Sequence, residues 1–124
     1  MGICTCYYYC AKSGRCDVEE FVDDLSESSC RHFFYKVELL EEFGPKLPMP
    51  HAKKIDKKEK IYELRFNERG GVVRALYFFF EGDEVVFTNA FVKKTNKTPK
   101  KEIETAINRK KLFLSNKAKK RVKK

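Results

Sequence analysis

Three closely spaced segments in the middle of this 124-residue chain constrain its fold more than any other feature. Each favours a β-strand, and the first alternates Tyr62, Leu64 and Phe66 on one face with polar residues on the other. Short turns that contain glycine separate the segments, as in β-hairpins. The sequence therefore predicts an antiparallel meander over three ranges: Ile61 to Glu68, Val72 to Glu81 and Glu84 to Lys93.

The segments that flank this meander predict one further strand and three helices. Residues 3–12 are rich in Tyr, Thr and Cys, which favours a first strand. Asp17 is a good N-cap for a helix, a second helix ends at Gly44-Pro45, and Thr98-Pro99 begins the last one. We expect residues 45–60 to form a connecting loop.

This order of elements predicts an α+β fold, in which an antiparallel or mixed sheet of about four strands carries two N-terminal helices and one C-terminal helix. The length fits a single domain with its own hydrophobic core. We expect the domain to span residues 1–114 and to be followed, over residues 115–124, by a basic tail of the kind that is often disordered.

Charge is distributed unevenly along the chain. Residues 1–92 carry a net charge of −3, whereas residues 93–124 carry +12, with 14 basic and 2 acidic side chains. A basic block of this size repels itself, and a polyanion is its usual partner. For the last ten residues, a role in solubility explains the lysines equally well. Acidic side chains gather in the two predicted N-terminal helices, where residues 17–42 hold nine acids and two bases.

The five cysteines favour reduced thiols and no metal. Their number is odd, no secretory signal accompanies them, and their spacing does not match the paired knuckles of structural zinc sites. Cys4, Cys6 and Cys10 share parity, so on a strand they would lie on one buried face. Because no apolar run is long enough to cross a membrane, we expect a cytoplasmic protein without membrane contact.

Residues of the common catalytic types are scarce. His32 and His51 have no second ligand at metal-binding spacing, and no glycine-rich phosphate loop or nucleophile motif occurs. We interpret both histidines as surface residues rather than catalytic groups. We expect neither a metal nor a cofactor.

Two arginines define a candidate site. If the first turn of the meander consists of Arg69 and Gly70, Arg65 lies directly opposite Arg74 on the neighbouring strand. Two neighbouring cations are unfavourable unless an anion joins them. Glu63 is one such anion, on the same face as Arg65, and a phosphate gripped by guanidinium groups is another. Lysines at the end of the third strand favour the phosphate.

The same region carries four short motifs in a fixed order. They are Y-E-L-R at residues 62–65, R-x-x-Y-F at 74–78, F-x-K-K-T-x-K-T-P at 91–99 and E-I-x-x-A at 102–106. In this combination they closely resemble the phage-derived HigB-like toxins of the RelE/ParE superfamily, and the resemblance extends over residues 5–114.

The resemblance implies a metal-independent endoribonuclease, the toxin of a type II toxin–antitoxin pair. Such a toxin cleaves messenger RNA on the translating ribosome and is silenced by a helix-turn-helix, HigA-like antitoxin. By motif position, the implied catalytic residues are Arg65, Arg74, Lys93 and Lys94. The lysines expected to bind RNA are Lys53, Lys54, Lys97 and Lys100.

The sequence leaves open which residues act as general acid and general base. Relatives often have a tyrosine or a histidine near the end of the last strand, and the stretch after Phe91 contains neither. Glu63 is the nearby carboxylate for a general base, but its arginine neighbours favour a structural ion pair. Clustered cations are consistent with stabilising the charge of a transition state.

Two alternatives also stay open. ParE-type relatives share the fold and act on DNA gyrase without cutting RNA, and an inactive phage-derived nucleic-acid-binding protein would have a similar composition. The converging cations favour RNA cleavage, because a gyrase-binding toxin needs no such site.

Overall fold

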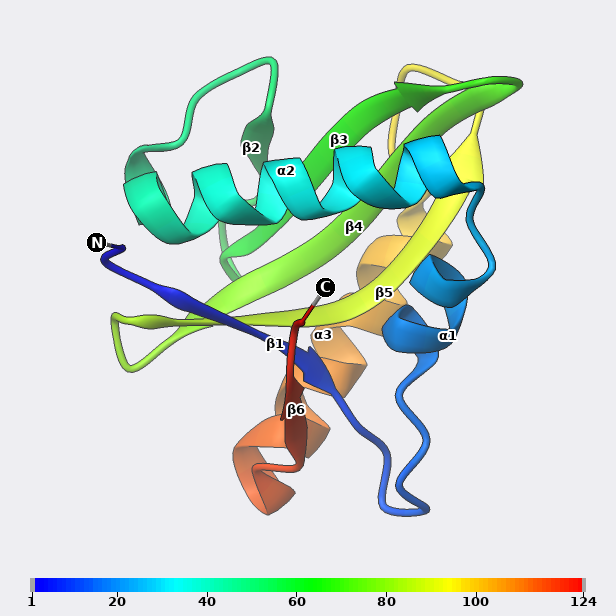
Figure 1. The fold of residues 1–124 in the computed structure, drawn as a ribbon. Coiled ribbons are helices and arrows are strands. Elements are labelled where there is room, and N and C mark those ends of the chain that lie inside the picture. Colours follow the sequence, from blue (N-terminus) through cyan, green and yellow to red (C-terminus); the bar gives the residue numbers. More distant parts are fainter. Residues whose placement is uncertain (1, 124) are drawn as a thin grey trace.

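The computed structural model describes residues 2–123, which form one mixed sheet with helices on both faces (Figure 1). The six strands are β1 Thr5–Tyr9, β2 Ala52–Asp56, β3 Ile61–Glu68, β4 Gly71–Phe80, β5 Glu84–Lys93 and β6 Lys119–Arg121. Across the sheet they lie in the order β2-β3-β4-β5-β1-β6. β1 runs parallel to β5, and the other neighbours are antiparallel.

Three helices cover the sheet: α1 Asp17–Asp23, α2 Glu27–Phe43 and α3 Lys100–Asn116. A short 3-10 helix, Gly44–Lys46, follows α2. The core beneath α1 and α2 includes Val18 and Phe33, whereas Phe113 of α3 packs against Phe78 in a second core on the opposite face. The predicted α+β class, with two N-terminal helices and one C-terminal helix, is confirmed. No helix among the described residues is long and apolar enough to span a membrane.

The helix starts differ from the predicted ones by one residue. Cys16 is the N-cap of α1, so Asp17 is its first helical residue and not its cap. Pro99 occupies the N-cap position of α3, and this position makes no side-chain hydrogen bond. The hydroxyl of the preceding Thr98 instead donates to a carboxylate of the sheet. A side chain that the sequence predicts as a helix cap therefore belongs to an interior network.

The register of the β3–β4 hairpin follows the prediction. Arg65 pairs with Arg74, and the same register sets Glu63 opposite Leu76. Because side chains alternate between faces along a strand, Glu63, Arg65 and Arg74 all lie on the face that α3 covers. The register of the hairpin thus places these three charged side chains on one face of the sheet.

Two strands lie where the sequence predicts a loop and a tail, which raises the number of strands from about four to six. β2 pairs with β3 as an edge strand, and β6 pairs with β1 at the opposite edge. Val122, directly after β6, is buried in the core. The basic side chains of β6 are neutralised within the chain by three ion pairs: Lys119 with Glu84, Lys120 with Glu19, and Arg121 with Glu41.

The expectation of five reduced cysteines is wrong for two of them. Cys10 and Cys16 form a disulfide. The chain between them turns back on itself, with the Gly14 amide donating to the carbonyl of Ala11, so that the two Cα atoms lie 4.3 Å apart. Spacing alone does not reveal such a contact. Cys4, Cys6 and Cys10 do share one core, as their parity predicts.

Candidate nucleic-acid interface

A buried ionic network lies at the centre of the predicted site. Glu63 on β3 and Arg74 on β4 are both fully buried, and Nη1 of Arg74 lies 3.3 Å from each Glu63 carboxylate oxygen. Thr98 donates its hydroxyl to Glu63 and accepts a hydrogen bond from Arg74. Arg74 also donates to the carbonyl of Thr95. The network therefore ties the strands to the loop that precedes α3.

Arg74, predicted as a phosphate contact, is an interior residue. Its side chain has no exposed surface, because α3 and the preceding loop cover the face on which it lies. Its Nε has no hydrogen-bond partner among the described residues. A buried pair with an unsatisfied donor is poorly optimised for stability, so its geometry favours a positioning role.

Glu63 is equally inaccessible as a general base. Both of its oxygens lie within 3.3 Å of Arg74, and Arg65 lies 3.8 Å away. A carboxylate that is paired with two guanidinium groups in the interior cannot reach a ribose hydroxyl in solution. This geometry favours the structural ion pair over the general base.

Arg65 is the arginine of this pair that reaches solvent. Its side chain is 21% exposed, and it is a cross-strand neighbour of the buried Arg74. Lys93 pairs with Val72 at the end of β5, which sets it on the same face as Arg65 and Arg74. Lys93 and the adjacent Lys94 are exposed. Arg65, Lys93 and Lys94 are therefore open to an anionic ligand, whereas Arg74 is not.

The four lysines predicted to bind RNA line two adjoining hollows at the start of α3. A hollow of about 340 Å³ is lined by residues from β2 and from the loop before α3, including Lys53, Lys54 and Lys97. An adjoining hollow contains Lys97 and Lys100. Thr98 of the buried network lines both hollows. Lys54 pairs with Tyr62, and its Nζ lies 5.5 Å from the centre of that ring, so its ammonium group lies on the sheet face opposite α3.

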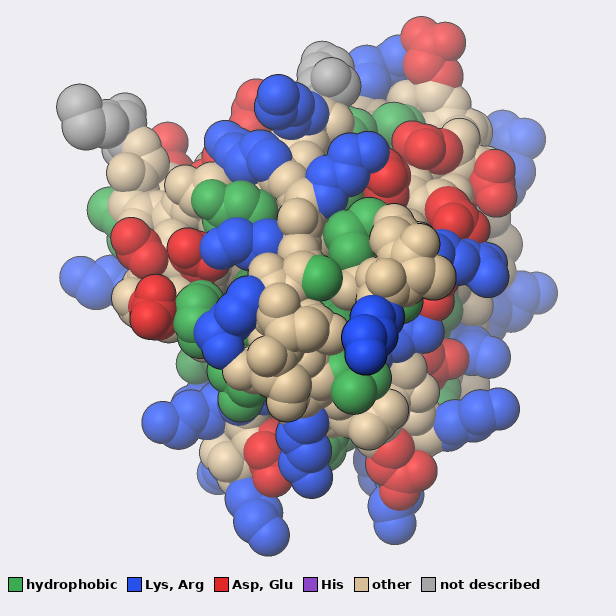
Figure 2. Space-filling model, turned by 90° about the horizontal axis from the view of Figure 1, so that it is seen from below, with side chains coloured by type: hydrophobic (Ala, Val, Ile, Leu, Met, Phe, Trp, Pro, Cys, Tyr) green, Lys and Arg blue, Asp and Glu red, His purple; other side chains and the backbone are tan. Residues whose placement is uncertain are grey.

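Basic side chains also occur far from this site. Figure 2 shows Lys and Arg distributed over the face seen from below, with Asp and Glu between them. The presence of lysines alone does not mark an interface. The feature that distinguishes the site is that Arg65 and Lys93 share a strand face with a buried ion pair.

A second group of basic residues, which the sequence does not predict, lies at the edge of β3. Lys36 of α2 is only 7% exposed, and its Nζ lies 2.6 Å from Nδ1 of His51. Burial lowers the pKa of Lys36. Burial and then the Lys36 charge lower the pKa of both His32 and His51. The interpretation of His51 as a surface residue is wrong, because it is half-buried and bonded to Lys36.

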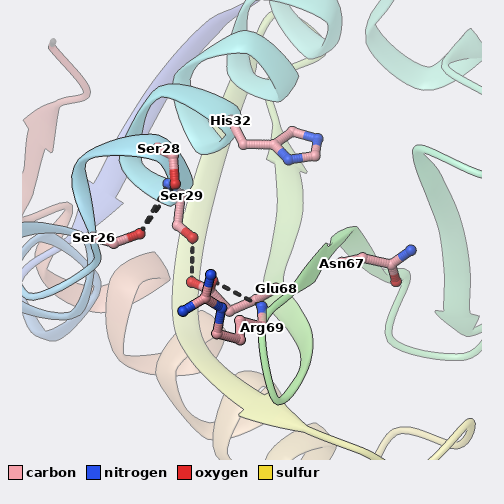
Figure 3. Close-up of a pocket in the computed structure, with 7 residues that line it drawn as sticks. All are labelled: Ser26, Ser28, Ser29, His32, Asn67, Glu68 and Arg69. Atoms are coloured by element: carbon pink, nitrogen blue, oxygen red, sulfur yellow. Dashed lines mark hydrogen bonds between the residues drawn. The ribbon is translucent and has the colours of Figure 1, made fainter.

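These residues border two connected hollows. One, of about 380 Å³, is lined by His32, Lys36, Met49, Pro50, Arg65, Phe66 and Asn67. The other, drawn in Figure 3, shares His32 and Asn67 with it and extends to the first turn of α2. His32 is exposed and its ring lies 4.4 Å from that of Phe66. The sequence pattern could have revealed the burial of Lys36, because this lysine interrupts the apolar stripe of its helix between Phe33 and Leu40.

A small α+β domain with a cationic face organised by a buried ion pair is the class that the fold and the site define. The chain belongs to the family described as Phage derived protein Gp49-like (DUF891), whose model matches residues 20–111.

Two curated relatives carry the name of a probable endoribonuclease. The chain is 43% identical over 53 residues to "Probable endoribonuclease HigB1" from two strains of Mycobacterium tuberculosis, CDC 1551 / Oshkosh and ATCC 25618 / H37Rv. The match covers 43% of this chain and 42% of each relative, so it spans less than half of their length. The predicted resemblance to the HigB-like toxins is confirmed at this level.

Proposed function

We propose that this protein is the toxin of a type II toxin–antitoxin pair and cleaves messenger RNA on the translating ribosome. The observation that carries the proposal is the position of Arg65, which reaches solvent beside the buried Glu63–Arg74 pair and shares a face with Lys93. Similarity to a probable endoribonuclease adds support. Messenger RNA, the ribosome and a helix-turn-helix antitoxin are the proposed partners, and the first two are cytoplasmic.

In this mechanism Arg65, Lys93 and Lys94 contact the scissile phosphate. The ribose 2′-hydroxyl loses its proton to water as its oxygen bonds to phosphorus, which forms a pentacoordinate species with added negative charge. The P–O5′ bond then breaks and O5′ takes up a proton from water, which leaves a 2′,3′-cyclic phosphate and a 5′-hydroxyl. Fixed cations stabilise that charge, typically the largest contribution in such reactions. Arg74 acts as a positioning residue, because its bonds to Glu63 and Thr95 hold the strand face and the loop before α3 together.

The lysines around α3 bind the backbone on either side of the cleaved bond. Lys53, Lys54, Lys97 and Lys100 are exposed or half-buried and belong to adjoining hollows. Their contribution is electrostatic and independent of sequence. Alignment of the RNA by the ribosome supplies a further large part of the rate enhancement, since orientation alone lowers a barrier substantially.

The test is cleavage of a defined messenger RNA by the purified chain, with and without programmed ribosomes. Wild-type protein should cut the RNA and Arg65→Ala should not. Arg31→Ala is the matched control, because Arg31 is an exposed arginine of α2 whose partner is Glu27. Intact RNA together with an induced DNA-damage response on expression would reject the proposal in favour of a gyrase-targeting toxin.

A further inference from the structure

Lys36 is a buried lysine without an acidic partner. It is 7% exposed, and no carboxylate in residues 2–123 lies within ion-pair distance of its Nζ. Its one hydrogen-bond partner in that range is Nδ1 of His51, which is itself a base. Burial of an ammonium group against another basic group is costly, and an anion in contact with Nζ would offset that cost.

The fold brings this pair to an open edge of the sheet. β2 pairs with β3 only as far as Leu64. Beyond that point the backbone carbonyl of His51 accepts a hydrogen bond from the amide of Arg65. Lys36 reaches the same place from α2. The result is the hollow of about 380 Å³ that contains Lys36, His32 and Arg65.

The carboxylates near this hollow are already occupied. Glu68 faces His32 and raises its pKa, but it accepts hydrogen bonds from Ser29 and from the amide of Arg69. Glu63, on the other face of β3, is held by Arg74. The basic groups that line the hollow therefore lack a matching negative charge within the described residues, and an external anion is the group that would complete the site.

We infer that this hollow binds a phosphate of the RNA backbone, at Lys36 and His32, as a contact separate from Lys93 and Lys94. The RNA identity of the ligand rests on the proposed function, and the shared chemistry is a phosphate group. Arg65 connects the two places, since its backbone amide donates to His51 at the hollow and its side chain lies beside the buried ion pair on the other face of β3. Phe66 and Met49 add apolar surface for the sugar or base that accompanies the phosphate.

Binding at this hollow takes up a proton. In the unliganded protein burial and the Lys36 charge favour neutral His51, and burial and Lys36 act on His32 against the opposing effect of Glu68. A bound phosphate brings negative charge toward these groups and favours their protonated forms. The affinity therefore rises as the pH falls, by up to about tenfold per pH unit for each proton taken up.

The experiment measures the dissociation constant of a non-cleavable 2′-O-methyl RNA from about pH 8 to about pH 6 at constant ionic strength, a range in which histidine titrates. Wild-type protein should bind more tightly at the lower pH. Lys36→Met should weaken binding by about tenfold, as expected for one lost buried phosphate contact, and His51→Asn should flatten the pH dependence. Lys12→Met, at an exposed lysine in the turn after β1, is the control.

Two outcomes separate this inference from the proposed function. Folded Lys36→Met and His51→Asn proteins with wild-type affinity and pH dependence overturn the inference while RNA cleavage stands. If Lys36→Met does not fold, the half-buried His51→Asn variant carries the same test. If inorganic phosphate shifts the ring resonances of His51 but RNA is neither bound nor cut, RNA as the ligand and the proposed function both fail.

Discussion

Glu63 and Arg74 face one another from neighbouring strands, and neither side chain has any exposed surface. Thr98 joins them from the loop before α3. The two paired arginines therefore have different roles. Arg74 holds the site together from within, and Arg65 is the one that a ligand can reach.

Replacement of Arg74 should unfold the protein or weaken it strongly. Arg74→Ala leaves the Glu63 carboxylate buried without its partner, which typically costs about 3–5 kcal/mol. Urea denaturation followed by circular dichroism measures the change. The apolar double variant Glu63→Leu/Arg74→Met is the control and should lose less, because it removes both charges. An Arg74→Ala protein with wild-type unfolding would contradict the interior role.

Replacement of Arg65 should abolish RNA cleavage while the fold is retained. Arg65 is partly exposed, and Glu63 keeps Arg74 as its main partner. Loss of one preorganised cation from a transition state lowers kcat by roughly 100- to 1,000-fold. Arg65→Lys should recover only part of the rate, because an ammonium group cannot make the bidentate contact. Wild-type kcat in a folded Arg65→Ala protein would remove Arg65 from the site.

The lysines at the end of β5 and just after it should differ from those of β6 in their effect on RNA binding. Lys93→Gln and Lys94→Gln should each reduce the slope of log affinity against log salt by about 0.7, the value for one contact to a single strand. Lys119→Gln and Lys120→Gln should leave the slope unchanged, because ion pairs within the chain already occupy these side chains. Equal effects from the two strands would show that β6 also binds RNA.

Val122 should stabilise the protein even though it lies in a basic segment. It is buried in the core beneath α1 and α2, directly after β6. Removal of its two methyl groups in Val122→Ala should lower the free energy of unfolding by about 2 kcal/mol. Chemical denaturation of this variant beside Lys123→Ala, an exposed neighbour, provides the comparison. Equal stability of the two proteins would mean that the segment is not docked.

Acid should destabilise the unliganded protein as the pH falls below about 6.5, the ordinary pKa of histidine. His32 and His51 have lowered pKa values in the folded state, first because of burial and then because of the Lys36 charge. The unfolded chain therefore binds more protons in this range, and the free energy of unfolding decreases with falling pH. Thermal melting of His51→Asn should show a weaker dependence than the wild type between about pH 7 and pH 5.

Local sequence patterns were sufficient to predict the meander and the strand faces on which its charged side chains lie. The alternation in β3 and the short turn at Arg69-Gly70 predict the pairing of Arg65 with Arg74, which the structure has. The three helices and the α+β class were equally accessible, since caps, apolar stripes and Gly44 are local signals. The sequence also predicts which face of the sheet each charged side chain occupies.

What covers that face was decided by the tertiary structure. Arg74 and Glu63 look like surface charges in the sequence, and they are interior because α3 and the loop before it pack over them. Lys36 and His51 meet only because α2 and the end of the loop before β2 converge at the sheet edge. Burial and pairing depend on contacts between distant segments, whereas periodicity records only the direction of a side chain relative to its own backbone.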